Sequence, residues 1–133
     1  MAFAGINYLA VVIAAVAGFM VGWGWYMALG KPWMEALGKT KDDLKPSPLP
    51  FILAFVAQVV MAYMLAGVIG HLGDVTIVRG IITGFFVWLG FVITTMVVNH
   101  GFQGAKPILT AIDGGHWLAV LVVMGAIIGG FGV

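Results

Sequence analysis

Charged residues occupy a few short stretches of the chain, and four long apolar segments separate them. Asp, Glu, Lys and Arg are absent from residues 1–30, 46–70, 80–99 and 114–133. A transmembrane helix needs about 20 mostly apolar residues, because each residue advances about 1.5 Å through a hydrocarbon core about 30 Å thick. The pattern predicts an all-α integral membrane protein, a single domain of four transmembrane helices at about residues 3–29, 48–71, 77–100 and 107–131.

Two alternatives to this arrangement are disfavoured by the same pattern. Membrane β-barrels need strands of about 10 residues that alternate polar and apolar side chains, and runs such as YLAVVIAAVAGFMVG do not alternate. A cleaved signal peptide begins with positive charge and has an apolar centre of about 7–15 residues. No Lys or Arg precedes Lys31, and the first apolar run is much longer than such a centre. We therefore expect the first segment to be a helix of the mature protein.

The polar stretch between the first two helices has helical signals of its own. In GKPWMEALG, Pro32 suits a first helical turn and Gly38 a C-terminal cap. Trp33 and its apolar neighbours would lie at the headgroup boundary while Lys31 faces water. A short interfacial helix is therefore predicted between helices 1 and 2. Thr40 is expected to cap the turn that follows it.

Composition shows that the solvent for this chain is the lipid bilayer. The chain is 62% hydrophobic and 8% charged, whereas soluble domains carry about 25% charged residues. A formal net charge of +1 excludes the broad basic surface that nucleic-acid binding requires. The absence of cysteine excludes disulfides and thiolate metal sites. Ser47 is the only serine and no phosphate-binding loop is present, so we expect no enzyme activity and no cofactor.

Orientation follows from the distribution of the cations. Four lysines lie between helices 1 and 2 and Lys106 lies between helices 3 and 4, whereas the other side of the membrane carries only Arg79. Cytoplasmic loops carry an excess of Lys and Arg. The lysine loops are therefore predicted to be cytoplasmic and both termini periplasmic, in a multi-pass protein of a bacterial inner membrane.

Small residues recur every four positions on the first two helices, which predicts a close helix 1–helix 2 hairpin. The candidate packing residues are Gly18, Gly22, Gln58, Ala62 and Ala66, with Gln58 as an interhelical hydrogen-bonding residue. The chain has three GxxxG pairs, at 18/22, 80/84 and 125/129. Their number is no evidence for helix–helix contacts, because 20 glycines in 133 residues give about three such pairs by chance.

A polar cluster is the strongest candidate for a functional site. Asp113 lies six residues past Pro107, about 9 Å into helix 4, and His116 lies on the same face about 14 Å in. Thr95 and Asn99 reach comparable depths on helix 3. Adjacent antiparallel helices would bring these four residues together.

Each member of the cluster has a structural interpretation beside a functional one. Asp113 is near enough to the membrane edge to extend its carboxylate outward or to be neutralised by a lysine. A neutral His116 bonded to Asp113 or Thr95 would be satisfied inside the bundle. The functional interpretation is a proton relay through Asp113 and His116. A metal site is disfavoured, because with His100 the two residues supply only three ligands.

The sequence resembles the bacterial membrane proteins grouped as domain of unknown function 1761. The resemblance rests on NYLAVVIAAVAGFMVGWGWY followed by GKPWMEALG, on WLGFVITTMVVNHGFQG and on GGHWLAVLVVMGAIIGG, and it covers nearly the whole chain. It implies four transmembrane helices and a bacterial membrane, and it supplies no activity. An uncharged polar residue often aligns with Asp113 in the family pattern, which argues against an obligatory ionised pair there.

Two function classes are consistent with these features. The first is a non-enzymatic accessory or structural subunit that packs in the bilayer with a larger membrane complex or with itself as a homo-oligomer. The second is a small permease or channel-like protein with a proton or solute path through Asp113 and His116. The first is preferred because the chain has small-residue stripes, short loops and no soluble domain.

Overall fold

Four long helices make up the protein. The computed structural model describes residues 3–44 and 47–132. The elements are α1 (Tyr8–Leu37), the 3₁₀ helix η1 (Lys41–Asp43), α2 (Leu49–His71), α3 (Ile77–Val87), the π-helical turn η2 (Trp88–Val92), α4 (Ile93–Gln103) and α5 (Pro107–Phe131). Because α3, η2 and α4 are continuous, the described residues contain four helices long and apolar enough to cross a membrane, and no β-strand. The predicted fold class is confirmed.

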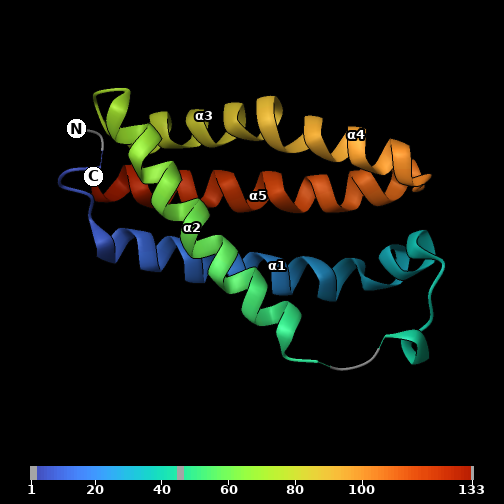
Figure 1. Ribbon diagram of the computed structural model, residues 1–133. Coiled ribbons are helices and arrows are strands. Elements are labelled where there is room, and N and C mark those ends of the chain that lie inside the picture. The colour runs from blue at the N-terminus through green and yellow to red at the C-terminus, as the bar shows by residue number, and fades with distance from the viewer. Residues whose placement is uncertain (1–2, 45–46, 133) are drawn as a thin grey trace.

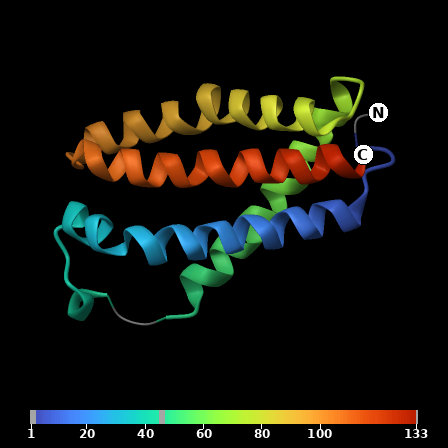
Figure 2. The ribbon, with the colours of Figure 1, turned by 180° about the vertical axis from the view of Figure 1, so that it is seen from behind.

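The last helix is at the centre of the arrangement. In both views α5 lies between α1 on one side and the α3–α4 span on the other, while α2 crosses obliquely (Figures 1 and 2). The beginning of α1 and the end of α5 lie at the same end of the molecule, and the α1–α2 and α4–α5 connections lie at the other (Figure 1). We call the latter the lysine end, because it carries Lys31, Lys39, Lys41 and Lys106.

The first helix has defined boundaries. It begins at Tyr8 rather than near residue 3, because the Asn7 side chain accepts a hydrogen bond from the Ala10 N–H at 3.1 Å and caps it. Leu29 departs from helical geometry (φ −111°, ψ 16°) and kinks α1 shortly before Pro32. The helix ends at Gly38, whose left-handed conformation (φ 69°) ordinary side chains disfavour.

The segment predicted as a separate interfacial helix is the last part of α1, beyond the kink at Leu29. It is helical but continuous with the first span, and its place at the membrane surface stays a prediction. Thr40 then begins η1, where its N–H and Oγ1 donate to Asp43 Oδ2 at 2.8 and 3.0 Å. Thr40 occupies the N-cap position as expected, but in these two bonds the Asp43 carboxylate is the acceptor and Thr40 is the donor.

The third span changes its winding halfway. At η2 the Ile93 N–H donates to the Trp88 carbonyl, five residues back. A π-helical turn holds more residues than an α-helical one, so the faces of α4 are rotated relative to those of α3. As a result α3 packs closely along α5, whereas α4 makes fewer contacts with it.

The backbones of α3 and α5 are in direct contact. A β-carbon added to Gly80 would fall on the carbonyl oxygen of Gly125, and one added to Gly84 would fall on that of Leu121. A β-carbon on Gly129 would meet the Thr76 carbonyl in the same way. Only glycine permits such an approach, which increases van der Waals contact between helices in lipid. Two of the three GxxxG pairs, 80/84 and 125/129, therefore form this contact although their number alone carried no weight.

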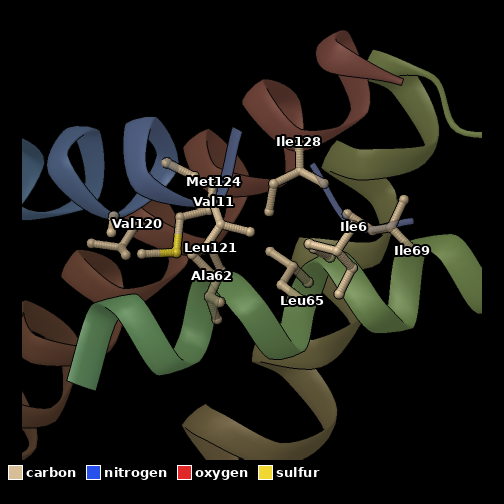
Figure 3. Close-up of a cluster of buried hydrophobic side chains, with 12 residues drawn as sticks. Ile6, Val11, Ala62, Leu65, Ile69, Val120, Leu121, Met124 and Ile128 are labelled. Atoms are coloured by element: carbon tan, nitrogen blue, oxygen red, sulfur yellow. The ribbon is translucent and has the colours of Figure 1, made fainter. Parts of the chain in front are cut away.

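The hydrophobic core lies where α1, α2 and α5 meet, toward the end opposite the lysine end (Figure 3). Val120, Met124 and Ile128 of α5 are completely buried. Val11 of α1 and Leu65 of α2 pack against them from the other two helices. Side chains in this region are apolar and closely packed.

Candidate functional site: a polar turn of α5

The turn of α5 from Ile112 to His116 is held on two sides by tryptophans. Trp25 of α1 donates its indole N–H to the Ile112 carbonyl at 3.0 Å. Trp88 of η2 donates to the Gly114 carbonyl at 2.8 Å. An indole N–H inside the bundle needs an acceptor. Two carbonyls of α5 supply it to the tryptophans of the two neighbouring spans. We call Ile112–His116 with the side chains that contact it the polar turn.

Glycines let the neighbouring side chains reach the polar turn. A β-carbon on Gly114 would lie 2.5 Å from Cδ1 of Ile93, and one on Gly115 would lie 2.9 Å from Cζ2 of Trp25. The absence of side chains at these two positions therefore leaves room for Ile93 of α4 and for the Trp25 indole.

Asp113 has a phenol as its partner. The Tyr26 hydroxyl donates to Asp113 Oδ1 at 2.5 Å, and both side chains are half-buried. Tyr26 is itself positioned by an edge-on contact with Trp33, with ring centroids 5.4 Å apart. Within residues 3–44 and 47–132 no lysine forms an ion pair with Asp113, and Lys45, one of the cations considered as its partner, lies outside the described residues.

His116 is buried among aromatic rings, with 5% of its surface exposed. Its ring centroid lies 5.1 Å from that of Tyr26 and 4.5 Å from that of Trp117. On the α1 side a β-carbon on Gly22 would lie 2.8 Å from His116 Nε2, so the imidazole is packed against the bare backbone at this glycine. Neither ring nitrogen has a hydrogen-bond partner among the described residues.

The structure brings together only two of the four residues of the predicted cluster. Asp113 and His116 both contact Tyr26. Thr95 and Asn99 are exposed on α4, and the Thr95 hydroxyl donates to the Phe91 carbonyl at 2.8 Å in its own helix. The prediction assumed a regular third helix, whereas the π-helical turn rotates α4.

His100 also has a local partner. Its Nδ1 lies 2.7 Å from Thr110 Oγ1, which joins the end of α4 to the beginning of α5. Among the described residues no three His, Asp or Glu side chains lie close enough together to hold a metal ion.

The predicted packing residues of α1 and α2 occupy the crossing of these helices. Ala62 and Ala66 are completely buried, and a β-carbon on Gly18 would lie 2.6 Å from Gln58 Oε1. Gly22 contacts α5, through His116, instead of α2. Gln58 is buried at the crossing as expected, but its Oε1 has no hydrogen-bond partner among the described residues, so the predicted interhelical bond through this oxygen is not formed.

Sequence reasoning missed the part that Tyr26 and Trp25 play. From the sequence both are expected to be aromatic anchors at the membrane boundary, the usual place for such residues near the end of a span. The available signal was the polar atom on each ring, since a half-buried phenol or indole near a buried carboxyl group needs a partner. The distance between residues 26 and 113 along the chain hid the pairing.

Comparison with known proteins gives a family without an assigned activity. The family model described as "Protein of unknown function (DUF1761)" matches residues 9–129. No curated protein matches the chain, and no solved structure matches it. Since the matched residues include nearly all of the four spans and the whole polar turn of α5, the chain belongs to the DUF1761 family.

Proposed function

We propose that the protein is a non-enzymatic membrane subunit that associates laterally, with a second copy or with a larger membrane complex, through the outward face of α4. This face consists of Thr95, Asn99 and Phe102 of α4 together with Phe91, which lies one turn earlier in η2. Phe91 and Phe102 are 73% and 92% exposed, and Thr95 and Asn99 between them are exposed as well. No other described segment of the chain covers this face.

The amide of Asn99 is the observation that carries the proposal. It is exposed on a helix of a membrane span. Asn side chains commonly form hydrogen bonds across helix–helix contacts in membranes. Such a bond contributes about 0.6–2 kcal/mol, enough to orient one helix against another. A partner helix on this face would satisfy the amide.

Burial along the chain supports the same face. In the most apolar 18-residue stretch of the third span, 11% of the residues are buried, against 44% in the fourth. The third span therefore presents most of its surface outward. Asp113 and His116 contact aromatic rings and backbone, which agrees better with a structural role for the polar turn than with an aqueous path.

Cysteine cross-linking tests the association directly, because the chain contains no cysteine. Asn99→Cys and Phe102→Cys are oxidised in native membranes, and the adducts are identified by mass spectrometry. We expect covalent dimers or adducts with another membrane protein at both positions. Val60→Cys on α2, where Val60 is 55% exposed, is the matched control. Equal adduct formation at Val60 and on α4 contradicts the proposal.

The orientation proposed with this function has the lysine end in the cytoplasm of a bacterial cell and both termini in the periplasm. It rests on the lysines of the α1–α2 and α4–α5 connections and on the positive-inside rule. A membrane-impermeant thiol reagent is expected to label Asp74→Cys in the α2–α3 connection of intact inverted vesicles poorly and Asp42→Cys readily. The opposite labelling reverses the orientation.

A second candidate function is a small permease with a proton or solute path. Its supporting observation is that both ring nitrogens of His116 and Oε1 of Gln58 are buried and have no partner in the part of the chain that the structure describes. In proteoliposomes with an internal pH dye, this candidate predicts that Asp113→Asn abolishes flux while cross-linking at Asn99→Cys is unchanged. Thr94→Val, which removes an exposed hydroxyl on α4, is the control. Flux that survives Asp113→Asn and His116→Ala excludes a path through these residues.

A further inference from the structure

A cavity of about 400 Å³ lies between α4 and α5 near the lysine end. It is open on one side, and its wall includes Ile93, Val97 and His100 from α4 and Pro107, Thr110 and Ala111 from α5. We call it the α4–α5 groove. Its volume is within the range of about 300–1,000 Å³ that is typical of small-molecule sites.

The groove follows from the local sequence. The π-helical turn rotates α4, which makes fewer contacts with α5 than α3 does. Small residues, among them Gly101 and Ala111, then leave the space between the helices unfilled. At the inner end Ile93 packs against Gly114 and closes the groove. From Ile93 to Gly101 the groove runs about 12 Å, which compares with about 15 Å for one leaflet of the hydrocarbon core.

The groove is apolar at its inner end and polar at its outer end, as the two ends of a lipid are. Its inner wall is apolar, from Ile93, Val97 and Ala111. Its outer part carries the hydrogen-bonded pair of His100 Nδ1 and Thr110 Oγ1, 2.7 Å apart. The pair forms with either tautomer of His100; in the tautomer with its proton on Nε2, the Thr110 hydroxyl donates to Nδ1 and Nε2–H is a donor for an anion.

The charge at the outer end is positive. Lys106 is exposed immediately before Pro107, and the first turn of α5 contains no acidic residue. Basic pockets between transmembrane helices at the cytoplasmic boundary recognise anionic lipid headgroups. This charge, together with an apolar interior open to the side, matches a ligand with an acyl chain and a negative headgroup.

We propose that the α4–α5 groove binds one anionic phospholipid, with an acyl chain along Val97 and Ala111 and the headgroup phosphate beside His100 and Lys106. The outward face of α4 lies on the other side of that helix, since Thr95 and Asn99 are each two residues, or about 200°, from the groove residues Val97 and Gly101. The lipid site is therefore independent of lateral association. It holds whether or not Asn99 meets a partner.

Native mass spectrometry of the purified protein, titrated with phosphatidylglycerol or phosphatidylcholine, tests the site. We expect one tightly retained phosphatidylglycerol and weaker retention of phosphatidylcholine. Lys106→Gln should weaken phosphatidylglycerol binding about fivefold, the effect of about one basic residue near a lipid surface. Lys31→Gln, at the same end but on α1, is the matched control. Equal retention of the two lipids, or equal loss in both variants, overturns the proposal.

Filling the groove separates lipid binding from surface charge. Ala111→Leu and Val97→Phe add volume from opposite walls, and each should abolish retention of phosphatidylglycerol while helical content and thermal stability are kept. Because the two changes are on different helices, a folding defect in one leaves the other as a test. Retention unchanged in a folded variant overturns the proposal.

Two other occupants give distinct results. Inorganic phosphate that displaces phosphatidylglycerol at millimolar concentration would show that the headgroup alone is bound, which contradicts the acyl-chain assignment. Cross-linking of Val97→Cys to a second copy would show that the groove is a protein interface, which also contradicts it. We expect neither.

Discussion

The two halves of α5 are held in the bundle by different physical means. From Val120 to Gly129 the helix is packed through apolar residues: Gly125 and Gly129 lie against the backbone of the third span, and Val120, Met124 and Ile128 are completely buried. From Ile112 to His116 it is held by side-chain hydrogen bonds, two from indoles and one from a phenol. The first half therefore depends on the close approach of the α3 and α5 backbones. The second half depends on hydrogen bonds to its carbonyl and carboxylate oxygens.

This difference shows how a small membrane bundle positions polar residues. Lipid is as apolar as the side chains, so helices associate through close packing and hydrogen bonds instead of hydrophobic burial. The glycine-packed half holds α5 against α3 without a polar side chain from α5. The polar turn can then hold Asp113 and a buried His116 on the same helix.

The largest expected effect is at the glycine-packed half. Gly80→Leu places a side chain on the Gly125 carbonyl, so α3 and α5 must separate. Overpacking of a close contact costs about 1–3 kcal/mol and sometimes more, and here the obstacle is backbone that cannot change rotamer. We expect a loss at or above the upper end of this range, measured as the free energy of unfolding in mixed micelles.

The control for this change is Gly24→Ala, where an added β-carbon meets no atom within 4 Å. Alanine in an exposed helical position is favoured over glycine by about 0.5–1 kcal/mol. Stability should therefore stay the same or rise slightly. Equal destabilisation by the two changes would mean that the α3–α5 backbone contact is not what holds this half.

The polar turn should be most sensitive at its phenol. Tyr26→Phe removes the donor to Asp113 and leaves a half-buried carboxyl group without it. The expected cost is about 1–3 kcal/mol, the usual penalty for an acceptor that loses its partner. Tyr8→Phe, at a tyrosine that is 65% exposed, is the control.

A double-mutant cycle decides whether this cost belongs to the Tyr26–Asp113 pair. In an Asp113→Leu background, Tyr26→Phe should cost much less, because the acceptor is already gone. The same cost in both backgrounds would assign the effect to ring packing against Trp33 and His116.

A smaller effect is expected at Gly22 of α1, where a glycine lies against His116 of the polar turn. Gly22→Ala brings a β-carbon to 2.8 Å from His116 Nε2, and the imidazole must shift by a few tenths of an ångström. We expect Gly22→Ala to lower the free energy of unfolding by about 1 kcal/mol in the wild-type background. In a His116→Ala background, where the imidazole is absent, Gly22→Ala should lower it no further. Gly30→Ala, with no atom within 4 Å of the added carbon, should not show this coupling.

The smallest effect lies outside both halves, at η1. Hydrogen bonds from the Thr40 backbone and hydroxyl hold the pKa of Asp43 below its usual value. A lowered folded-state pKa means that the bonded turn is favoured above about pH 4 and is lost as pH falls through the folded pKa. The amide NMR signal of Thr40 should therefore move toward its unfolded position at low pH, with no change in global unfolding.

Asp43→Asn should remove this titration of the Thr40 signal, whereas Asp42→Asn should preserve it. A Thr40 signal that titrates in the Asp43→Asn variant would mean that another group caps the turn. Because Asp43 is fully exposed, neither half of α5 should respond to either change.

The number and approximate limits of the spans could be read from the sequence, since a charge in hydrocarbon is costly and the chain keeps its charges between the apolar segments. The sequence also predicted the N-cap position at Thr40 and the C-cap at Gly38. The π-helical turn had no comparable signal. Without it Thr95 and Asn99 were expected to face Asp113, whereas they face outward.

The sequence by itself determined that four apolar helices fill this chain, because hydropathy and length are properties of each segment alone. It did not determine which faces meet, since helices that are apolar on all sides carry no pattern to distinguish lipid from protein. Only the tertiary structure decided that Gly80 meets Gly125, that Tyr26 meets Asp113 and that His116 lies against Gly22. These contacts depend on the relative rotation and crossing of helices far apart in the chain, and close packing in three dimensions selects them.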